Sequence, residues 1–167
     1  MERGASVIDR YEYAHRKNII FLVKLAGKKN LIKVKEGDWP DNTECIYSIL
    51  KDTAGNVILI EQSPYSQSGD WYIECKHYFL ADGKTFAFRK RETVFDESVK
   101  GGVAMETFFK FYDDKFNLTN KTYRITDKDD KLIFRNKSEF DFRDFKETIY
   151  RNVTDCLRAD NIKLEDK

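Results

Sequence analysis

The sequence predicts an α+β fold in which an antiparallel β-meander sheet packs against an N-terminal and a C-terminal helix. Apolar residues recur every three or four positions near both ends of the chain, as in amphipathic helices. Between these segments apolar and polar residues alternate with a period of two, and acidic or glycine-containing turns separate the alternating runs. The apolar stripe of each helix needs a partner, and a face of the sheet is the large surface that can supply it.

The chain has 167 residues, the length of one domain. We expect residues 1–167 to form a single domain with flexible ends at 1–5 and 161–167. Its 13 Phe, 9 Tyr and 2 Trp, against 8 Gly and 2 Pro, exclude a disordered or collagen-like chain. The longest apolar run, residues 19–23, is too short to cross a membrane, so we expect a soluble protein without a transmembrane segment.

The charges nearly balance, with 30 Lys and Arg against 29 Asp and Glu, so we expect no nucleic-acid partner. One segment, residues 84–91, alternates aromatic rings with cations and partly resembles an RNA-recognition strand. It departs from that pattern at Thr85, Arg89 and Arg91, and a strand with one wet and one dry face explains it better. Five lysines within residues 24–35 form a second basic cluster, which we interpret as a solvated rim.

The first element is a helix within residues 6–26, where apolar side chains keep a spacing of three and four. Ser6 or Asp9 can cap this helix, and Gly27 can end it. The alternative breaks the helix near Asn18 and makes residues 19–25 a buried strand, because that run is rich in β-branched residues. We favour the single helix.

The middle of the chain predicts the meander. A hairpin around the turn at residues 52–55 comes first, and residues 63–70 form an exposed loop after it. The later strands are expected at residues 71–80, 85–95, 103–112, 118–126 and 132–134. In the strand 85–95, Phe86 and Phe88 face the core, whereas Arg89 and Arg91 face solvent.

The last element is a second helix that begins at residues 138–141 and ends in a polar tail. Its apolar residues keep helical spacing and are Phe142, Phe145, Ile149, Val153 and either Cys156 or Leu157. We expect this stripe to pack on the sheet.

The cysteines and histidines indicate no metal or catalytic site. Cys45, Cys75 and Cys156 are odd in number and widely spaced, so we interpret them as buried free thiols. Cys75 and His77 share one face of a strand, but their spacing is not specific for a metal or for a nucleophile pair. We expect no catalytic residues, no metal and no cofactor.

Carboxylates supply an alternative function. Glu92, Asp96, Glu97 and Glu106 lie near the break at Gly101–Gly102, where a bulge or loop could aim two acids into a cleft. Two carboxylates held some 5–9 Å apart are the machinery of glycoside hydrolysis. The alternative is therefore a carboxylate-dependent hydrolase acting on carbohydrate or another polar substrate.

Four segments of the chain carry a resemblance, namely residues 68–73, 77–79, 82–88 and 102–107. Over about residues 39–131 the chain resembles small uncharacterised β-rich proteins of Bacteroidetes, which are often exported or lipid-anchored. The resemblance implies no activity, but it implies an extracytoplasmic location, periplasmic or at the cell surface. The sequence as it stands shows no export signal, which favours the cytoplasm unless a leader was removed.

The most favoured function is a noncatalytic binding or protein-interaction module. Tyr65, Trp71 and Tyr72 are the residues expected to contact its protein or carbohydrate ligand, because rigid rings near a loop give contact area at low entropic cost. The alternative for these rings is a place in the core. An exposed sheet edge could also form a homodimer.

Overall fold

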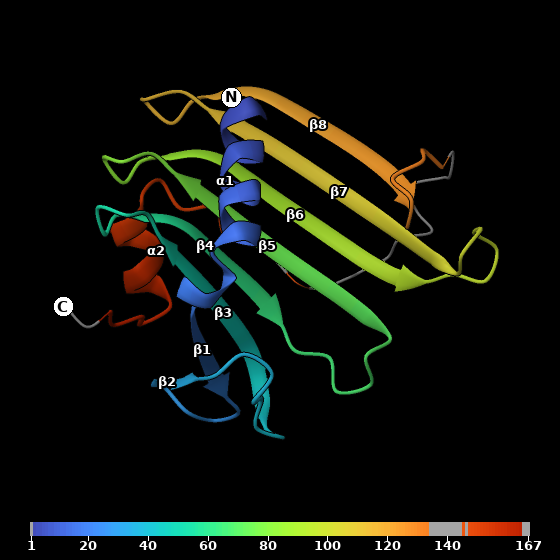
Figure 1. Ribbon diagram of the computed structural model, residues 1–167, viewed down its shortest axis with the longest axis horizontal. Helices are drawn as coiled ribbons and strands as arrows, with labels where there is room; N and C mark the ends of the chain where they lie inside the picture. The colour runs from blue at the N-terminus through green and yellow to red at the C-terminus, as the bar shows by residue number, and fades with distance from the viewer. Residues whose placement is uncertain (1, 134–144, 146, 165–167) are drawn as a thin grey trace.

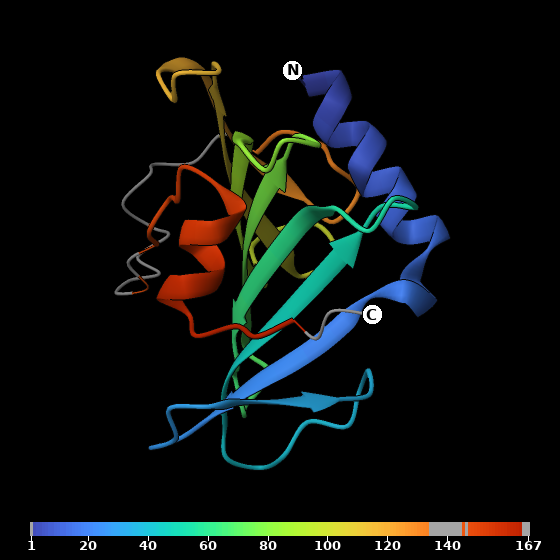
Figure 2. The ribbon, with the colours of Figure 1, turned by 90° about the vertical axis from the view of Figure 1, so that its left-hand side faces the viewer.

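The computed structural model describes residues 2–133, 145 and 147–164. Eight strands form one antiparallel sheet in the order β2-β1-β3-β4-β5-β6-β7-β8. Figure 1 shows α1 (Glu2–Ala14) crossing the strands, and Figure 2 shows the sheet between α1 on one face and α2 (Val153–Ala159) on the other. The α+β meander with one helix near each end is therefore confirmed. The strands are β1 (Ile20–Leu25), β2 (Leu31–Val34), β3 (Thr43–Lys51), β4 (Val57–Pro64), β5 (Trp71–Phe79), β6 (Thr85–Phe95), β7 (Val103–Tyr112) and β8 (Leu118–Asp127).

The prediction of one helix through residues 6–26 was wrong, and the alternative with a strand is observed. The helix α1 ends at Ala14, a single 3-10 turn η1 (Arg16–Asn18) follows, and β1 begins at Ile20. β1 lies between β2 and β3 and pairs with both. Two ladders of backbone hydrogen bonds, together with the β preference of its Ile and Val residues, outweigh the helical spacing.

The predicted hairpins and the alternation of side chains in β5 are confirmed. The expectation that Phe86 and Phe88 share one face of β6 was wrong, because the register shifts between Tyr78 and Phe79 and Phe86 packs on the α1 face. β3 and β4 pair around the turn at residues 52–55, and the pairs β5–β6 and β7–β8 are also antiparallel. Gly83 has a φ of 80°, a left-handed conformation that favours glycine, in the turn between β5 and β6. The loop predicted at residues 63–70 starts later, because β4 continues to Pro64 and Ser63 is buried.

The prediction that Arg89 of β6 faces solvent was wrong. Arg89 is only 8 % exposed, because α1 covers this face and its Asp9 pairs with the guanidinium. A helix that packs on the polar side of the strand therefore gives the sheet two buried faces. Near the end of β8 the described part of the predicted strand 132–134 forms only an isolated bridge, between Leu132 and Thr126.

The second helix is shorter than predicted. It begins at Val153, where Asn152 caps it by accepting a hydrogen bond from the backbone N–H of Asp155 at 2.8 Å. Residues 147–150 are not helical, because this part of the chain binds to the sheet: the Thr85 N–H donates to the Arg151 carbonyl. The predicted start at residues 138–141, and Phe142, lie outside the described residues.

Both faces of the sheet carry apolar clusters, and the chain ends contribute to them. Ala5 of α1 packs against Leu50, Leu59 and Tyr78, among others, on the first face. On the second face Ile162 joins the cluster around α2. The ends that the sequence predicts to be flexible thus include buried side chains. In the part of the chain that the structure describes, no helix is long and apolar enough to span a membrane.

Candidate functional site

A cleft of about 450 Å³ opens where α1 ends and β1 begins. Its wall is formed by α1 and η1 on one side and by the sheet and the segment between β2 and β3 on the other. The lining residues are Asp9, Glu12, Tyr13, Arg16, Ile19, Phe21, Glu36, Trp39, Ile46, Ser48, Glu61, Ser63 and Tyr72. The break between α1 and β1 lies at this cleft, because residues of α1, of η1 and of β1 all line it.

Aromatic rings form part of the cleft wall. Phe21 of β1 and Trp39 meet edge to face with their ring centres 5.7 Å apart. Tyr72 of β5 is 44 % exposed, and its hydroxyl donates to Glu61 Oε1 at 2.8 Å. Tyr13 at the end of α1 is 86 % exposed at the rim. Rings with open faces beside polar groups are typical of small-molecule sites.

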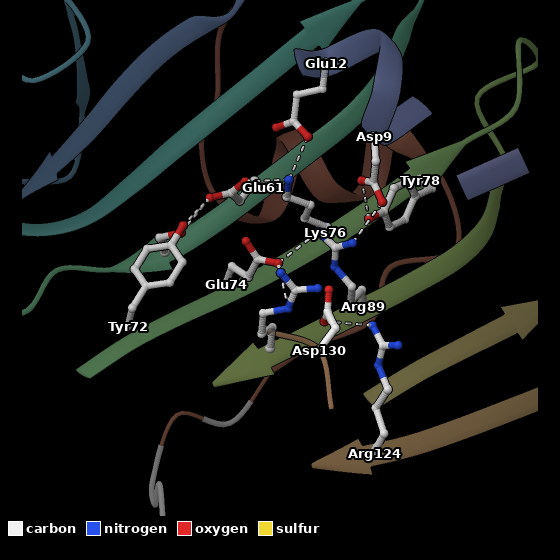
Figure 3. A network of polar contacts seen from close by, with 12 residues as sticks. Asp9, Glu12, Glu61, Tyr72, Glu74, Lys76, Tyr78, Arg89, Arg124 and Asp130 are labelled. Carbon is white, nitrogen blue, oxygen red and sulfur yellow. Dashed lines mark hydrogen bonds and ion pairs between the residues drawn. The ribbon is translucent and has the colours of Figure 1, made fainter. Parts of the chain in front are cut away.

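The carboxylates of Glu12 and Glu61 line the floor of the cleft, and both pair with the ammonium group of Lys76, which is not part of the lining. We call these three residues the floor triad (Figure 3). The Lys76 Nζ lies 2.7 Å from Glu12 Oε2 and 3.1 Å from Glu61 Oε2. The side chain of Lys76 is 7 % exposed. Ser63 also donates to Glu61 Oε1, at 2.9 Å. The triad thus joins α1 to β4 and β5.

The pKa values of the two floor carboxylates move in opposite directions. Burial raises the pKa of Glu12, and the neighbouring charges of Glu61 and Asp9 add to this, although Lys76 opposes it. Burial alone would also raise the pKa of Glu61, but Lys76 and the hydroxyls of Tyr72 and Ser63 stabilise the anion and lower it. Glu61 therefore stays ionised more firmly than Glu12.

A second buried network lies beside the floor triad. Arg89 pairs with Asp9 Oδ2 and with Glu74 Oε1, each at 2.9 Å. The Tyr78 hydroxyl donates to Asp9 Oδ1 at 2.8 Å, and burial holds the pKa of Tyr78 well above its usual value. Arg91 lies 3.9 Å from the same Glu74 oxygen. These contacts fix the position of α1 over the sheet.

At the rim, Arg16 and Glu36 form an exposed ion pair. The Arg16 Nε donates to Glu36 Oε1 at 2.7 Å, and the side chains are 67 % and 42 % exposed. The pair joins η1 to the segment between β2 and β3. It spans the cleft without burying either charge, so solvent screens it.

The structure does not bring the three predicted aromatic residues together. Tyr72 lines the cleft, whereas Trp71, its neighbour in β5, faces the opposite side of the sheet and packs beside Ile73. The Tyr65 backbone N–H donates to Glu44, and its ring is not part of the cleft lining. Alternation along a strand places consecutive side chains on opposite faces, so Trp71 and Tyr72 cannot share a site.

Two acids of the predicted hydrolase site, Glu92 and Glu106, lie on the face opposite the cleft, whereas Asp96 and Glu97 lie in the connection between β6 and β7. Glu92 of β6 and Glu106 of β7 are paired in register and are 5 % and 4 % exposed. Burial raises the pKa of Glu92, against the hydrogen bond from Lys90, whose Nζ lies 2.8 Å away. Asp96 instead caps a turn by accepting from the Ser98 N–H.

The cysteines and His77 have structural environments. All three cysteines are free and buried, as predicted. Burial raises the pKa of Cys45 to about 11 and of Cys75 to about 12, so both thiols are protonated. Burial lowers the pKa of His77 to about 4, and its neutral Nε2 accepts from the Tyr150 N–H at 3.2 Å. Among the described residues no three His, Cys, Asp or Glu side chains are placed to hold a metal ion.

Sequence reasoning missed most of the cleft, including Glu12, Trp39 and Glu61. One signal was present: Asp9 and Glu12 are three residues apart on α1, so they share a helix face. An acidic pair on the side of a helix that faces a sheet needs cations on the sheet surface that the helix covers. Lys76 of β5 and Arg89 of β6 lie on that surface.

Comparisons of the chain with protein-family models, with curated proteins and with solved structures found no match. The chemistry of the cleft itself is therefore what indicates a function.

Proposed function

We propose that this protein is a noncatalytic binding module and that its ligand occupies the cleft between α1 and the sheet. The observation that carries this proposal is the combination of aromatic wall and charged floor in one opening of about 450 Å³. That volume lies within the usual range of roughly 300–1,000 Å³ for small-molecule sites. Apolar rings supply contact area, and the few polar groups of the floor orient the ligand.

A position between elements that are distant in sequence also supports the proposal. The lining comes from α1, η1, four strands of the sheet and the segment with Glu36 and Trp39. The floor triad fixes the inner end of the cleft through buried contacts. A site held by buried ion pairs needs little reorganisation on binding, which favours affinity.

Titration with aromatic probes tests this proposal. Phenol, indole and 3-phenylpropan-1-ol are added to the ¹⁵N-labelled chain while amide chemical shifts are recorded. We expect the largest shifts at Phe21, Ser48 and Tyr72, with millimolar affinities. Shifts that instead gather around Trp71 and Ile73 would move the site to the other face, and no saturable shift with any probe would refute the proposal.

A carboxylate-dependent hydrolase is the second candidate. Because Glu12 and Glu61 contact the same Lys76 nitrogen, their bound oxygens lie within about 6 Å, near the separation of acids in retaining glycosidases. Their pKa values diverge, as those of an acid and a nucleophile must. However, an ammonium beside both carboxylates opposes the positive charge of an oxocarbenium-like transition state, which favours the binding module.

An activity assay separates the two candidates. Purified protein is incubated with a panel of para-nitrophenyl glycosides, and nitrophenolate release is compared with that of Glu12→Gln and Glu61→Gln. We expect equal background rates in all three proteins. Release that both substitutions abolish would establish the hydrolase instead. An extracytoplasmic location and a homodimer through a sheet edge stay predictions from the sequence.

A further inference from the structure

The charges of the cleft do not balance. Four lining side chains are acidic, and Arg16 is the single basic one in the lining. Two acids have their own cations: Glu36 pairs with Arg16, and Asp9 pairs with Arg89. The acids in question are Asp9, Glu12, Glu36 and Glu61.

The excess negative charge lies on the floor triad. Glu12 and Glu61 share the one ammonium of Lys76. The deeper Glu74 has its own cations, Arg89 at 2.9 Å and Arg91 at 3.9 Å. With both floor acids ionised, the triad therefore carries one net negative charge, and an added cation would balance it.

Glu12 is the floor acid that can take a further partner. Glu61 uses both oxygens, for Lys76 and for the hydroxyls of Tyr72 and Ser63. Within the described residues the contact of Glu12 with Lys76 is made by Oε2, and Figure 3 draws a contact to only one of its two oxygens. The side chain of Glu12 keeps 16 % exposure and lines the cleft. Its second oxygen is thus available to a donor in the cleft.

The wall above the floor suits an apolar or aromatic group. Phe21 and Trp39 present a pair of packed rings, and Ile19 and Ile46 add aliphatic surface. Rings attract a cation through their faces as well as packing against apolar groups. A molecule with both a positive head and an apolar body would therefore satisfy the floor and the wall together.

We infer that the cleft binds an organic cation, an ammonium group on an aromatic or aliphatic body, with the ammonium at Glu12 and the body against Phe21 and Trp39. This inference rests on the proposed function, and it names the ligand class of that site. An anionic ligand would add charge of the wrong sign. A neutral polar ligand such as a sugar would leave the net negative charge of the floor triad unbalanced.

Three probes of nearly equal shape test the inference in a Trp71→Phe variant, in which the cleft residues are those of the wild-type chain. They are 3-phenylpropylammonium, 3-phenylpropan-1-ol and 3-phenylpropionate, whose head groups are positive, neutral and negative. Trp71→Phe leaves Trp39 as the single tryptophan, since the chain has 2, so its fluorescence reports on the cleft. We expect the ammonium to bind about tenfold more tightly than the alcohol, the scale of one charge-assisted hydrogen bond, and the propionate to bind most weakly.

Each outcome decides between the inference and the proposed function. Equal affinities of ammonium and alcohol refute the cation inference but leave the cleft as a binding site. Binding of neither refutes both proposals. Tightest binding of the propionate reverses the expected charge preference and likewise overturns the inference.

Two matched substitutions locate the head group. Glu12→Gln should remove the advantage of the ammonium over the alcohol, so that the ratio of the two affinities falls from about ten to about one. Glu44→Gln removes an equal carboxylate, one that pairs with Lys24 outside the cleft lining, and should change neither affinity. Thermal melting checks that both variants fold. A preserved ammonium preference in folded Glu12→Gln would contradict the inference.

Acidification gives a test without substitution. The groups that act on Glu12 are Lys76 of β5, Glu61 of β4, Asp9 of α1 and Arg16 of η1. Because burial raises the pKa of Glu12, this carboxylate should gain its proton before Glu61 as the pH falls. The affinity for the ammonium should then decrease while that for the alcohol stays constant. A parallel decrease of both would indicate loss of structure and contradict the inference.

Discussion

The two faces of the same strands are buried by different chemistry. In β5, Tyr72, Glu74, Lys76 and Tyr78 face α1, and all four take part in hydrogen bonds or ion pairs there. The alternate residues face α2, and they are Trp71, Ile73, Cys75, His77 and Phe79. Along β5 the second face is packed mainly by shape complementarity, whereas the first must satisfy buried charges.

The difference between the two faces indicates which of them is built for a property other than folding stability. A buried ion pair is often no more stabilising than apolar residues of similar volume, because desolvation offsets the attraction. The α2 face shows that this sheet can bury β5 with apolar side chains. Charges are concentrated on the face that contains the cleft, which is what a binding site requires.

Arg89 and Phe88 are neighbours in β6 on opposite faces, and removing either should have the largest effect. Arg89→Met leaves Asp9 and Glu74 buried without their shared partner, and we expect a loss of about 3–5 kcal/mol in the free energy of unfolding. Urea denaturation measures it. Lys84→Met, in an exposed pair with Asp82, should leave the midpoint unchanged. An Arg89→Met protein as stable as wild type would show that the network does not hold α1.

Phe88→Ala should cost a similar amount, about 3–5 kcal/mol, for a different reason. Phe88 is 1 % exposed and packs against Cys75 and Tyr112, so truncation leaves a cavity. The second substitution Glu74→Gln distinguishes the two faces. It should recover part of the stability lost in Arg89→Met, because it removes an unpaired charge, and none of that lost in Phe88→Ala. Equal recovery of stability in Arg89→Met and in Phe88→Ala would contradict the proposed difference between the two faces.

His77 should give the α2 face its own pH dependence. Its folded pKa of about 4 lies below the ordinary 6.5, so the unfolded chain takes up the proton first. Stability is therefore complete above pH 6.5 and is lost as the pH falls towards 4, by about 3 kcal/mol in total. Urea midpoints across this range should show a shallower slope for His77→Gln than for wild type. The same exchange at His15, which lies between α1 and η1, is the control, and an unchanged slope in His77→Gln would contradict the assignment.

The cleft face responds in a lower pH window. Because the folded pKa of Glu61 lies below its ordinary value of 4.5, its contribution is present above that pH and is lost on further acidification. Glu61→Gln should therefore flatten the stability curve below pH 4.5, where the wild-type carboxylate takes up its proton. A change confined to pH values above 4.5 would contradict the lowered pKa.

The sequence predicted at most positions of β5 and β6 which residues share a face, but not which faces are buried. The alternation in β5 was correct, whereas Phe86 and Phe88 of β6 lie on opposite faces because the strand register shifts beside them. Strand periodicity is a local property, so it is visible in one segment. Burial of Arg89 depends on a helix far away in the sequence that ends at Ala14. The cleft could not be predicted for the same reason, since residues on both sides of the boundary between α1 and β1 line it.

The start of α2 was missed because helical spacing persists where the backbone has other partners. Ile149 and Val153 fit a helical stripe, yet the Tyr150 N–H donates to His77 and the Arg151 carbonyl accepts from Thr85. These backbone groups form hydrogen bonds with the sheet instead of the hydrogen bonds that a helix would require. Asn152, a favourable cap, was the local signal that marks the observed start.

Removing that cap should have a moderate effect. In Asn152→Ala the Asp155 N–H loses its acceptor, and we expect a loss of about 1 kcal/mol in the free energy of unfolding. Asn152→Ser, which restores an acceptor without placing a carboxylate beside Asp155, should recover most of this loss. Urea denaturation measures both variants. If Asn152→Ser were as unstable as Asn152→Ala, the side chain would contribute through something other than the cap.

The rim pair should have the smallest effect on stability and still change binding. Arg16→Ala removes an exposed partner of Glu36, and screening by solvent leaves such pairs little net energy, so the urea midpoint should not move. Unlike the buried floor triad, the rim pair can open without exposing apolar core. Its loss frees the Glu36 carboxylate at the mouth, and the affinity for 3-phenylpropylammonium should rise about twofold at low salt and less at high salt. A lower affinity would show that Arg16 itself contacts the ligand, and would extend the site from the floor to the rim.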